Sequence, residues 1–399
     1  MRLLPAPSAA GGAVSVIPVV SDAPAAGPSE VILGDHVLGQ LLRLGAVVGL
    51  NDADTSLYGQ VLLNSLADTA RRPLSLPPAS PSFISDDHTP VEFSLAFTPG
   101  TAPVLRMLVE PGCASGDMAD SARVGLADIR EMASRWAFST AQLDALEDLF
   151  FPTAAEGPMA LWYALELRPG GVPGVKVYLN PSANGPEYAT RTVQEALRRL
   201  GHRNAFTALP DAAGYPFVAL DLSTRTTPRV KVYLRHPRLS AGDACALSRT
   251  GSILAEEQIK TFFHTAAGSL LPPGPGAEEG PRLLRRPALT CHAFTDREAG
   301  APSGFTLHIP VRDYVRDDEE ALTRATALLN QFGMDASVLS RALAALTSRE
   351  LTSGVGLIAY LALVYEQNRQ PRVTAYISSE AYAVRPPLSL PLQDRVSVS

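Results

Sequence analysis

The sequence predicts an α+β fold in which ten antiparallel strands, arranged as five hairpins, close into one barrel around a central chamber, with an outer ring of helices. Two observations support this class. An alternating apolar segment, a turn rich in Pro, Gly or charged residues and a second alternating segment recur five times along the 399 residues. Between successive repeats lie segments whose apolar residues have helical spacing.

Each repeat has the form of a β-hairpin. The paired segments are 91–97 with 104–111, 160–167 with 175–181, 216–222 with 229–236, 288–294 with 304–311, and 356–364 with 372–378. A sheet of ten strands tends to curl or close, because closure removes its exposed edges. Barrels of eight strands are just filled by side chains, so ten strands are expected to leave room for ligands. An open sheet with helices on one face is the alternative.

The segments between the hairpins are expected to be helical. They are 35–71, 119–150, 187–202, 239–267 and 317–346. Two of them carry capping signals, since Ser139 is followed three residues later by Gln142, and Asp317 by Glu320. The stretch 268–287 is rich in Pro and Gly and is expected to be a surface loop.

One barrel domain is expected, from residue 30 to residue 387. Residues 1–29 are rich in Pro, Ala, Gly and Ser, and Pro18 interrupts their only apolar run. They are therefore expected to form a disordered tail rather than a signal peptide. Residues 388–399 are expected to form a C-terminal tail.

The composition excludes several other classes of protein. Thirty-four basic against forty acidic residues give a net charge of −6, without the basic excess of nucleic-acid-binding proteins. The longest apolar stretch, 355–365, is too short to cross a bilayer, so no membrane segment is expected. Cys113, Cys245 and Cys291 form no CxxC pair, which argues against a disulfide framework or a zinc cluster and favours a cytoplasmic location.

Basic residues recur in register on the second strands of the hairpins. Residues two apart on a strand share a face, and aligning these strands gives two columns on one face. The first column is Arg106, Lys176, Lys231, Thr306 and Thr374, the second is Leu108, Tyr178, Tyr233, His308 and Tyr376, and Arg229 and Arg372 lie two residues upstream. Charge on the helix-covered face would be costly, so this face is expected to point inward.

Four of these residues, Arg106, Lys176, Arg229 and Lys231, would form a ring of cations suited to a diphosphate. The alternative is a solvated sheet face on which they pair with acids. The neighbouring tyrosines could stabilise a developing carbocation and exclude water from it, although a single tyrosine in a strand usually belongs to the core.

Glu92 is the acid expected to face the chamber. In the run SDDHTPVEFS it precedes an alternation, 93–97, whose apolar side chains face outward. There it could accept a hydrogen bond from a ring N–H and make that ring more nucleophilic. Trp162 and Phe217 would supply an aromatic floor. The alternative for Glu92 is a structural salt bridge to Arg106.

The sequence lacks the usual signals of a metal site. Asp86-Asp87 and the acids at 317–320 have no DDxxD spacing, and acids in the first turn of a helix are explained by its dipole. No two of the seven histidines are spaced i, i+4 as zinc ligands. Neither a metal nor a cofactor is therefore expected, and His308 is the only histidine assigned to the site.

Five motifs resemble one known family. They are TPVEFS, VLRMLVEP, KVYLNP, RVKVYL and the closing VTAYISSEAY. In this order they resemble the dimethylallyltryptophan synthase family of indole prenyltransferases, which have the ABBA prenyltransferase barrel. The resemblance covers 30–387. It is greatest to the bacterial tryptophan 6-dimethylallyltransferases, through the runs SDDHTPVEFSLAF, GVPGVKVYLNP and HIPVRDYV.

The resemblance implies dimethylallyl diphosphate as donor, L-tryptophan as acceptor, no required metal and a Friedel–Crafts alkylation at C6 of the indole. It implies that Glu92 binds the indole N–H, that the four cations bind diphosphate, and that Tyr178, Tyr233 and Tyr376 shield the allylic cation. Two departures stand out. Thr306 and His308 replace a polar residue and a tyrosine at the fourth hairpin, which puts diphosphate contacts there in doubt.

The second departure is that 160–167 lacks the lysine carried there by enzymes that alkylate indole C4, and this argues against C4. Three alternatives remain open at this point. The acceptor could be a tryptophan-containing cyclic dipeptide or an indole alkaloid, the position could be C5, C7 or N1, or the barrel could merely bind a small anion without catalysis.

Overall fold

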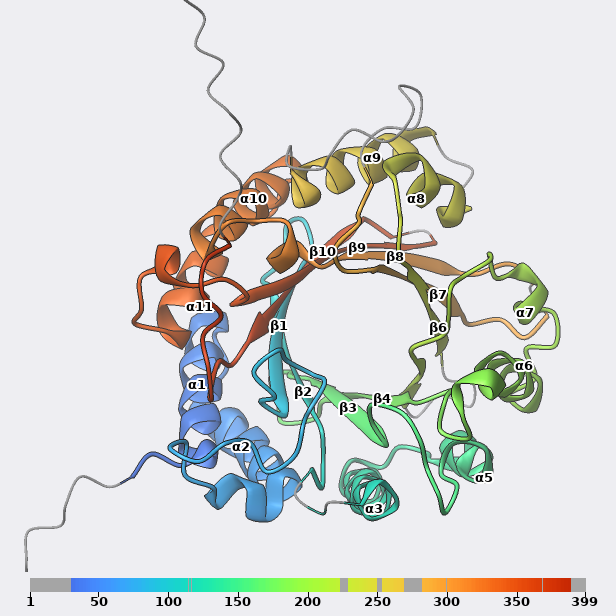
Figure 1. Cartoon of the computed structure of the whole chain (residues 1–399), viewed down its shortest axis with the longest axis horizontal. Coiled ribbons are helices and arrows are strands. Elements are labelled where there is room, and N and C mark those ends of the chain that lie inside the picture. Colours follow the sequence, from blue (N-terminus) through green and yellow to red (C-terminus); the bar gives the residue numbers. More distant parts are fainter. Residues whose placement is uncertain are drawn as a thin grey trace, which may run out of the picture. The chain divides into compact units, whose positions relative to one another are not determined.

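In the computed structural model the ten predicted strands form a closed antiparallel barrel, which rules out the open-sheet alternative. Residues 30–388 are described, except 114, 116, 223–228, 250–252, 269–281, 299 and 368. The predicted N-terminal tail, nearly all of the predicted C-terminal tail and most of the loop predicted at 268–287 lie outside the described residues. Figure 1 shows the strands arranged in a ring with helices around them.

The strands follow the predicted hairpins closely. They are β1 (Val91–Phe97), β2 (Val104–Val109), β3 (Leu161–Glu166), β4 (Gly174–Leu179), β5 (Val218–Leu222), β6 (Arg229–His236), β7 (Ala288–Phe294), β8 (Gly304–Ile309), β9 (Ile358–Glu366) and β10 (Arg372–Ser378). Each strand pairs with its neighbours along the chain, and β1 pairs with β10 to close the ring, with Glu92 opposite Ser378.

The alternation of side chains along β1 shows how the barrel separates its two faces. Phe93, Leu95 and Phe97 belong to the apolar core between the strands and the helices. Glu92 and Ser94 line the chamber on the other face. Every residue of β1 is buried, so burial alone does not distinguish its two faces. The period-two pattern of polar and apolar side chains does, with an apolar outer face and a polar inner face.

The helices are shorter and more numerous than the sequence predicts. The main ones are α1 (Leu33–Val48), α2 (Asp52–Leu66), α3 (Met118–Trp136), α4 (Ala141–Asp144), α5 (Glu147–Phe150), α6 (Ala189–Arg199), α7 (Ala205–Ala208), α8 (Ala241–Ser248), α9 (Ile253–Ala267), α10 (Asp318–Gln331) and α11 (Ser337–Leu346). The predicted helix at 35–71 is two helices because Gly49 ends α1 at φ 80° and the Asn51 side chain caps α2.

One of the two predicted caps is confirmed. Asp317 is the N-cap of α10, where its carboxylate accepts the N–H of Glu320. The cap at Ser139 is wrong, because Thr140 occupies the N-cap of α4 without a side-chain cap bond. Ser139 instead accepts the N–H of Ala141 through its hydroxyl.

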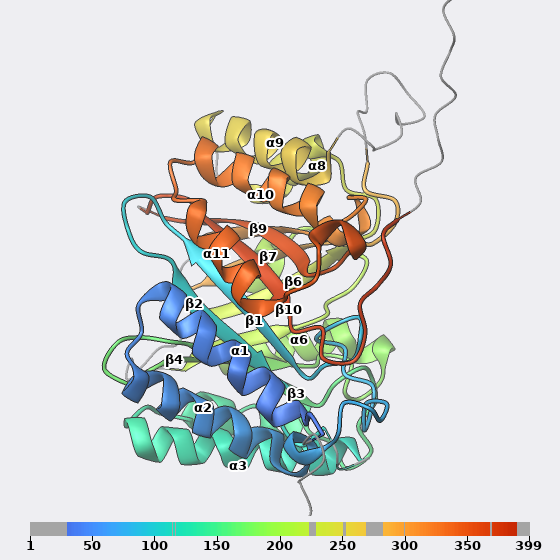
Figure 2. The ribbon, with the colours of Figure 1, turned by 90° about the vertical axis from the view of Figure 1, so that its left-hand side faces the viewer.

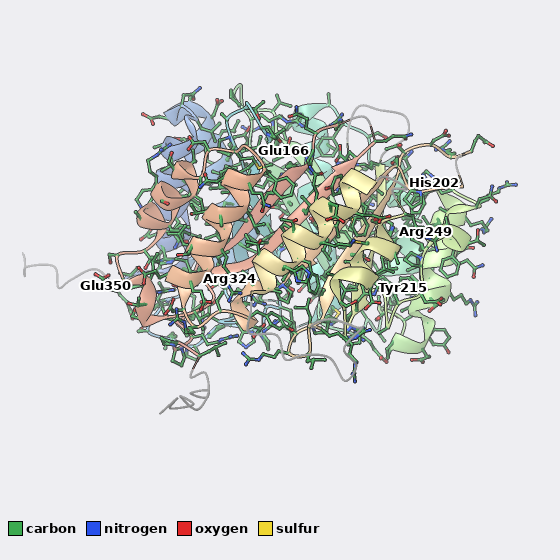
Figure 3. All side chains as sticks on the ribbon, turned by 90° about the horizontal axis from the view of Figure 1, so that it is seen from above. Glu166, His202, Tyr215, Arg249, Arg324 and Glu350 are labelled. Atoms are coloured by element: carbon green, nitrogen blue, oxygen red, sulfur yellow. The ribbon has the colours of Figure 1, made fainter. Side chains whose placement is uncertain are left out.

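The helices bury the outer face of the barrel. Figure 2 shows α1 beside α11 and α2, and α3 packs against β3. Figure 3 looks onto α9 and α10, which lie side by side, and there Arg324 of α10 donates to the carbonyl oxygen of Ala266. Among the described residues, no helix combines the length and the hydropathy needed to cross a membrane.

Candidate active site

Inward-facing side chains of eight strands line a cavity inside the barrel. Its lining is Glu92, Ser94, Arg106, Met107, Leu108, Ala164, Lys176, Tyr178, Lys231, Tyr233, Thr306, His308, Val364, Arg372, Thr374 and Tyr376. Eleven of the fourteen residues proposed from the sequence are in this set, and the other three, Trp162, Phe217 and Arg229, lie beside it. The register of the repeats thus brings distant parts of the chain to one place.

At one end of the cavity the basic side chains are held by acids. Arg106 binds Glu166 at 2.8 Å, Lys176 lies 3.4 Å from Asp221, and Arg229 binds Asp221 at 2.6 Å. Arg229 also binds Glu366 at 2.5 Å, and Arg372 lies 3.8 Å from Glu366. We call these five basic residues, Arg106, Lys176, Arg229, Lys231 and Arg372, the cation cluster.

Three acids against five cations leave a positive excess in the cation cluster. Although burial disfavours its charge, Asp221 has a pKa below the ordinary range because Lys176, Lys231 and Arg229 surround it. The pKa of Glu166 is likewise lowered to about 2, since Arg106 and Arg168 outweigh its burial. The acids therefore stay ionised and hold the basic side chains in place without cancelling their charge.

Lys231 differs from the other members of the cation cluster, because it forms no ion pair with any described residue. It is 5% exposed. Burial, and then the positive charge of Lys176, lower its pKa to about 7. Nearby, Arg372 Nε and Thr374 Oγ1 are buried without a hydrogen-bond partner among the described residues. An anionic ligand would satisfy all three groups.

Next to the cation cluster, four rings form a continuous belt. The ring centroids of Tyr178 and Tyr233 are 5.9 Å apart, those of Tyr233 and His308 are 5.7 Å apart, and those of His308 and Tyr376 are 5.7 Å apart. The Tyr376 hydroxyl lies 3.3 Å from His308 Nε2. Burial, then Lys231, lower the pKa of His308 to about 3, so the imidazole is neutral and completes the belt where the sequence departs from tyrosine.

Trp162 and Phe217 extend this belt toward the opposite end of the barrel. Their ring centroids are 5.2 Å apart, and that of Phe217 lies 6.0 Å from that of Tyr178. Trp162 packs with Ile84 and Met159 in a small apolar cluster. Trp162 and Phe217 are therefore neighbours of the cavity lining rather than part of it.

Glu92 lies one inward position beyond the pair Ser94–Arg106 on β1, where its partner in the register is Leu108 rather than a basic residue. Its expected alternative, a salt bridge to Arg106, is absent among the described residues, because Arg106 binds Glu166 instead. Burial raises the pKa of Glu92 to about 8, an effect that Arg312 opposes and Asp86 reinforces. This carboxyl group is therefore an inward-facing hydrogen-bonding group with no arginine bound to it.

The sequence interpretation missed five polar residues that lie beside the lining of this chamber. They are Glu166, Asp221, Glu366, Arg312 and Tyr360. Glu166 and Asp221 stand at inward positions of their strands, so the same alternation that located the lysines could have located them. Arg312 follows the end of β8 in a short 3-10 helix, where no strand register applies.

The acids that the sequence set aside as metal ligands have structural partners. Asp86 pairs with Arg286, Arg312 and Arg385. Asp318 is fully buried and binds Arg349. In the described part of the chain, no group of three or more His, Cys, Asp or Glu side chains is placed to hold a metal ion.

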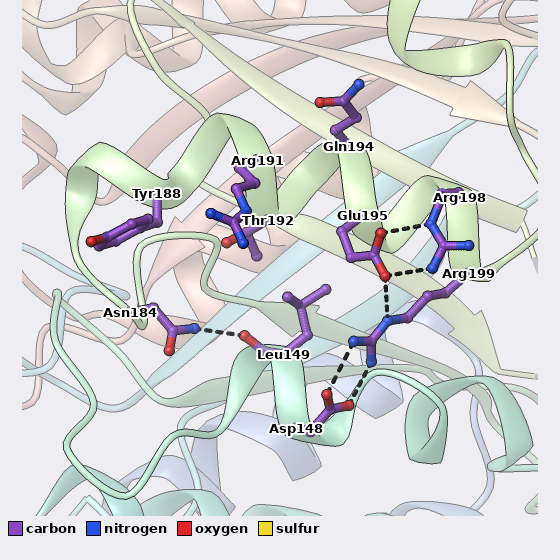
Figure 4. Close-up of a pocket in the computed structure, with 10 residues that line it drawn as sticks. All are labelled: Asp148, Leu149, Asn184, Tyr188, Arg191, Thr192, Gln194, Glu195, Arg198 and Arg199. Carbon is purple, nitrogen blue, oxygen red and sulfur yellow. Dashed lines mark hydrogen bonds and ion pairs between the residues drawn. The ribbon is translucent and has the colours of Figure 1, made fainter.

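A second pocket lies on the surface, over α5 and α6 (Figure 4). Its charged side chains are largely paired with one another, since Arg199 binds Asp148 and Glu195, and Arg198 binds Glu195. These contacts neutralise most of the charge that could select a ligand. The barrel cavity, with its excess of positive charge, is the better candidate for catalysis.

A barrel of this topology, with a cation cluster, a ring belt and a buried carboxyl group facing one chamber, defines the class of ABBA-type aromatic prenyltransferases. The comparison with known families agrees with this class. A family model described as tryptophan dimethylallyltransferase matches residues 55–341. The chain therefore belongs to the tryptophan dimethylallyltransferase family and is an aromatic prenyltransferase.

Solved structures extend the comparison over nearly the whole chain. Prenyltransferase PriB, in a ternary complex with L-tryptophan and dimethylallyl thiolodiphosphate, is 60% identical, with a TM-score of 0.85, over 90% of this chain and 99% of that one. The 5-dimethylallyl tryptophan synthase of Streptomyces coelicolor is 58% identical, with a TM-score of 0.84, over 92% of this chain and 100% of that one. The 6-dimethylallyltryptophan synthase of Micromonospora olivasterospora is 36% identical, with a TM-score of 0.79, over 90% and 100% respectively.

Proposed function

We propose that this enzyme transfers the dimethylallyl group of dimethylallyl diphosphate to C6 of the indole ring of L-tryptophan. The observation that carries the proposal is the chamber itself, in which a cation cluster and a buried carboxyl group lie at opposite ends of a belt of rings. The family match and the tryptophan complexes of PriB and of the S. coelicolor enzyme support the choice of substrates.

In the proposed reaction the C1–O bond of the donor breaks and diphosphate leaves with the bonding electron pair. The cation cluster receives this charge. Lys231, which makes no ion pair among the described residues, can donate to it, as can Arg372 Nε and Thr374 Oγ1, which have no hydrogen-bond partner there. Tyr178, Tyr233 and Tyr376, together with His308, enclose the allylic cation and keep water from it. No step requires a metal, because protein cations supply the positive charge.

At the opposite end, Glu92 accepts a hydrogen bond from the indole N–H. This bond increases the electron density of the ring, whose C6 carbon attacks C1 of the cation. The alkylated carbon then gives its proton to the released diphosphate, which restores the aromatic ring. Trp162 and Phe217 bound the space in which the ring lies. The inward side chains of β3 are Trp162, Ala164 and Glu166, so no lysine on this strand could remove a proton from C4.

C5 is a second candidate position for the new bond. The 58% identity with the S. coelicolor 5-dimethylallyl tryptophan synthase favours it, whereas C6 is supported by the motifs shared with tryptophan 6-dimethylallyltransferases and by the M. olivasterospora enzyme. The two positions differ only in which carbon lies nearest C1 of the donor, a small difference in placement.

The test is incubation of the enzyme with L-tryptophan, dimethylallyl diphosphate and EDTA, followed by NMR of the product. Prenylation at C6 without added metal is the expected result. Prenylation at C5 would select the second candidate. No prenylated tryptophan, or a strict requirement for magnesium, would refute the proposed reaction.

A further inference from the structure

The sequence contains three lysines, and they differ in how their amino groups are engaged. Lys176 lies 3.4 Å from the carboxylate of Asp221. Lys260 is on α9, where it pairs with Glu257 at 3.1 Å. Lys231 forms no ion pair with any described residue, although it is only 5% exposed. The barrel therefore encloses one amino group that no carboxylate holds.

Two hydrogen-bond donors in the same cavity also lack a partner. Arg372 Nε and Thr374 Oγ1, both on β10, are buried without a hydrogen bond to any described residue. Lys231 and Arg372 both act electrostatically on Glu366, which places their charges in one part of the cavity. A small anionic group attached to Lys231 would accept hydrogen bonds from these two donors.

A negative charge on Lys231 would also balance the charges of the cation cluster. With Lys231 protonated, five cations face the three carboxylates of Glu166, Asp221 and Glu366. With Lys231 converted to an anion, the remaining four cations face four negative charges. Buried charges are least costly when each has a partner, so this conversion removes the positive excess.

The amino group of Lys231 is also a nucleophile near neutral pH. Burial, and then the charge of Lys176, lower its pKa to about 7, so about half of it is uncharged at pH 7. Lys260 differs, because its hydrogen bond to Glu257 raises its pKa. The other charged or titratable side chains that interact electrostatically with Lys231 are Asp221, Arg229, Cys291, His308 and Glu366.

We infer that Lys231 is a carbamylation site, at which its uncharged amino group adds carbon dioxide to form a carbamate held by the cation cluster. In this step the nitrogen lone pair forms a bond to the carbon of carbon dioxide, and one C–O π pair moves onto oxygen. The nitrogen then releases a proton to solvent. Amine and carbon dioxide thus give a carbamate and a proton, and nothing is oxidised or reduced. Arg372 Nε and Thr374 Oγ1 donate to the carbamate oxygens.

The carbamate occupies the place where the cation cluster would receive diphosphate. A bound diphosphate favours the protonated form of Lys231, which does not react with carbon dioxide. Carbon dioxide and the prenyl donor therefore exclude each other, and carbon dioxide acts as a competitive inhibitor. The inhibition rests on the proposed function, whereas the modification itself does not.

The experiment traps the carbamate and locates it. The wild type, Lys231→Arg and Lys260→Arg are equilibrated with [13C]bicarbonate near neutral pH and alkylated with a trialkyloxonium salt, which converts a carbamate into a stable ester. Peptide mass spectrometry then identifies the labelled lysine. Lys231→Arg removes the amine but keeps a cation, and Lys260→Arg is the matched control for an exposed lysine.

We expect the label on Lys231 in the wild type and in Lys260→Arg, and its loss in Lys231→Arg. Saturating inorganic diphosphate should lower the label on Lys231 by about tenfold or more. In steady-state kinetics at constant ionic strength, bicarbonate should raise the wild-type KM for the donor by about threefold and leave kcat unchanged.

The inference is overturned if the wild type carries no more label on Lys231 than on Lys260. This result is read directly from wild-type peptides, so it does not depend on the folding of either variant. A higher KM without the label would mean that bicarbonate merely binds as an anion, and would also overturn it. If no tryptophan is prenylated, the proposed function fails, while the label on Lys231 still decides whether the carbamate forms.

Discussion

The two ends of the chamber shift the pKa values of buried carboxyl groups in opposite directions. In the cation cluster, five basic residues face three carboxylates whose charge is retained, as the lowered pKa values of Asp221 and Glu166 show. Around Glu92, burial raises pKa values instead, to about 8 for Glu92 and about 7 for Glu110. One barrel thus keeps the carboxylates of the cation cluster ionised and holds Glu92 largely protonated at neutral pH.

The difference follows from the partners that each strand position supplies. Asp221 sits between Lys176 and Arg229 in the strand register, so its neighbours compensate for the cost of burial. Glu92 has Leu108 and Ser378 as its cross-strand neighbours, neither of which carries charge. In the proposed reaction, the cation cluster receives the leaving diphosphate, and the uncharged strand neighbours of Glu92 accommodate the indole ring.

The largest loss of activity is expected when a basic residue of the cation cluster is removed. Arg229→Met removes one cation and also leaves Asp221 and Glu366 without their closest partner. Their freed negative charge would repel the diphosphate, so kcat/KM for the donor should fall by about 10³-fold. Steady-state kinetics measures this loss. Arg168→Met, at the more exposed rim and paired with Glu166, is the control and should cost less than about threefold.

A smaller effect is expected at the opposite end. Glu92→Gln should lower kcat by about 100-fold, because Glu92 can release its proton and carry a negative charge beside the cationic indole intermediate, which an amide cannot do. Glu110→Gln is the matched control, since Glu110 is also buried but its carboxylate is bound by Ser82 at 2.5 Å. Single-turnover rates should separate the two variants, and equal losses would count against a role specific to Glu92.

The substitution Glu92→Gln should raise the free energy of unfolding even though it lowers activity. The pKa of Glu92 is about 8 in the folded protein, above the ordinary value of 4.5 for a glutamate side chain. The unfolded chain therefore releases this proton first, so the wild type loses stability from about pH 4.5 up to pH 8. Glu92→Gln avoids this loss and should be more stable by a few kcal/mol at pH 8, but not at pH 4.5. Urea unfolding at both values tests the sign.

The smallest effect is a proton taken up with the donor. Because the pKa of Lys231 is about 7, this side chain is about half protonated at pH 7 before the diphosphate binds. Binding should raise that pKa and take up about half a proton, most of which Lys231→Met should abolish. Calorimetry in buffers of different ionisation enthalpy measures the uptake. Equal uptake by both proteins would show that the proton goes elsewhere.

Most of the barrel could be predicted because a strand pattern is local. The period-two alternation places Lys176 and Tyr178 on one face whatever the partner strand is, and the structure agrees. The breaks within helices were harder to predict. Apolar spacing continues across the interruptions after Gly49 and at Gly333, where positive φ values end α1 and separate α10 from α11.

The site was predicted less completely than the barrel, because its electrostatics depends on long-range pairs. The basic face was expected to need an external anion, yet Arg229 binds Glu366 across 137 residues of sequence. Periodicity on one strand cannot identify such a partner. Arg312 lies outside any strand, so only the folded chain shows that it stands near Glu92.

The division of the chamber into two ends is tested most directly by the affinity for dimethylallyl thiolodiphosphate. Calorimetry in the presence of EDTA would compare the wild type with Lys231→Met and Glu92→Gln. We predict binding about 100-fold weaker for Lys231→Met and changed by less than about threefold for Glu92→Gln. Equal weakening in both variants, or no binding by the wild type without added magnesium, would contradict the separation of a donor end from an acceptor end.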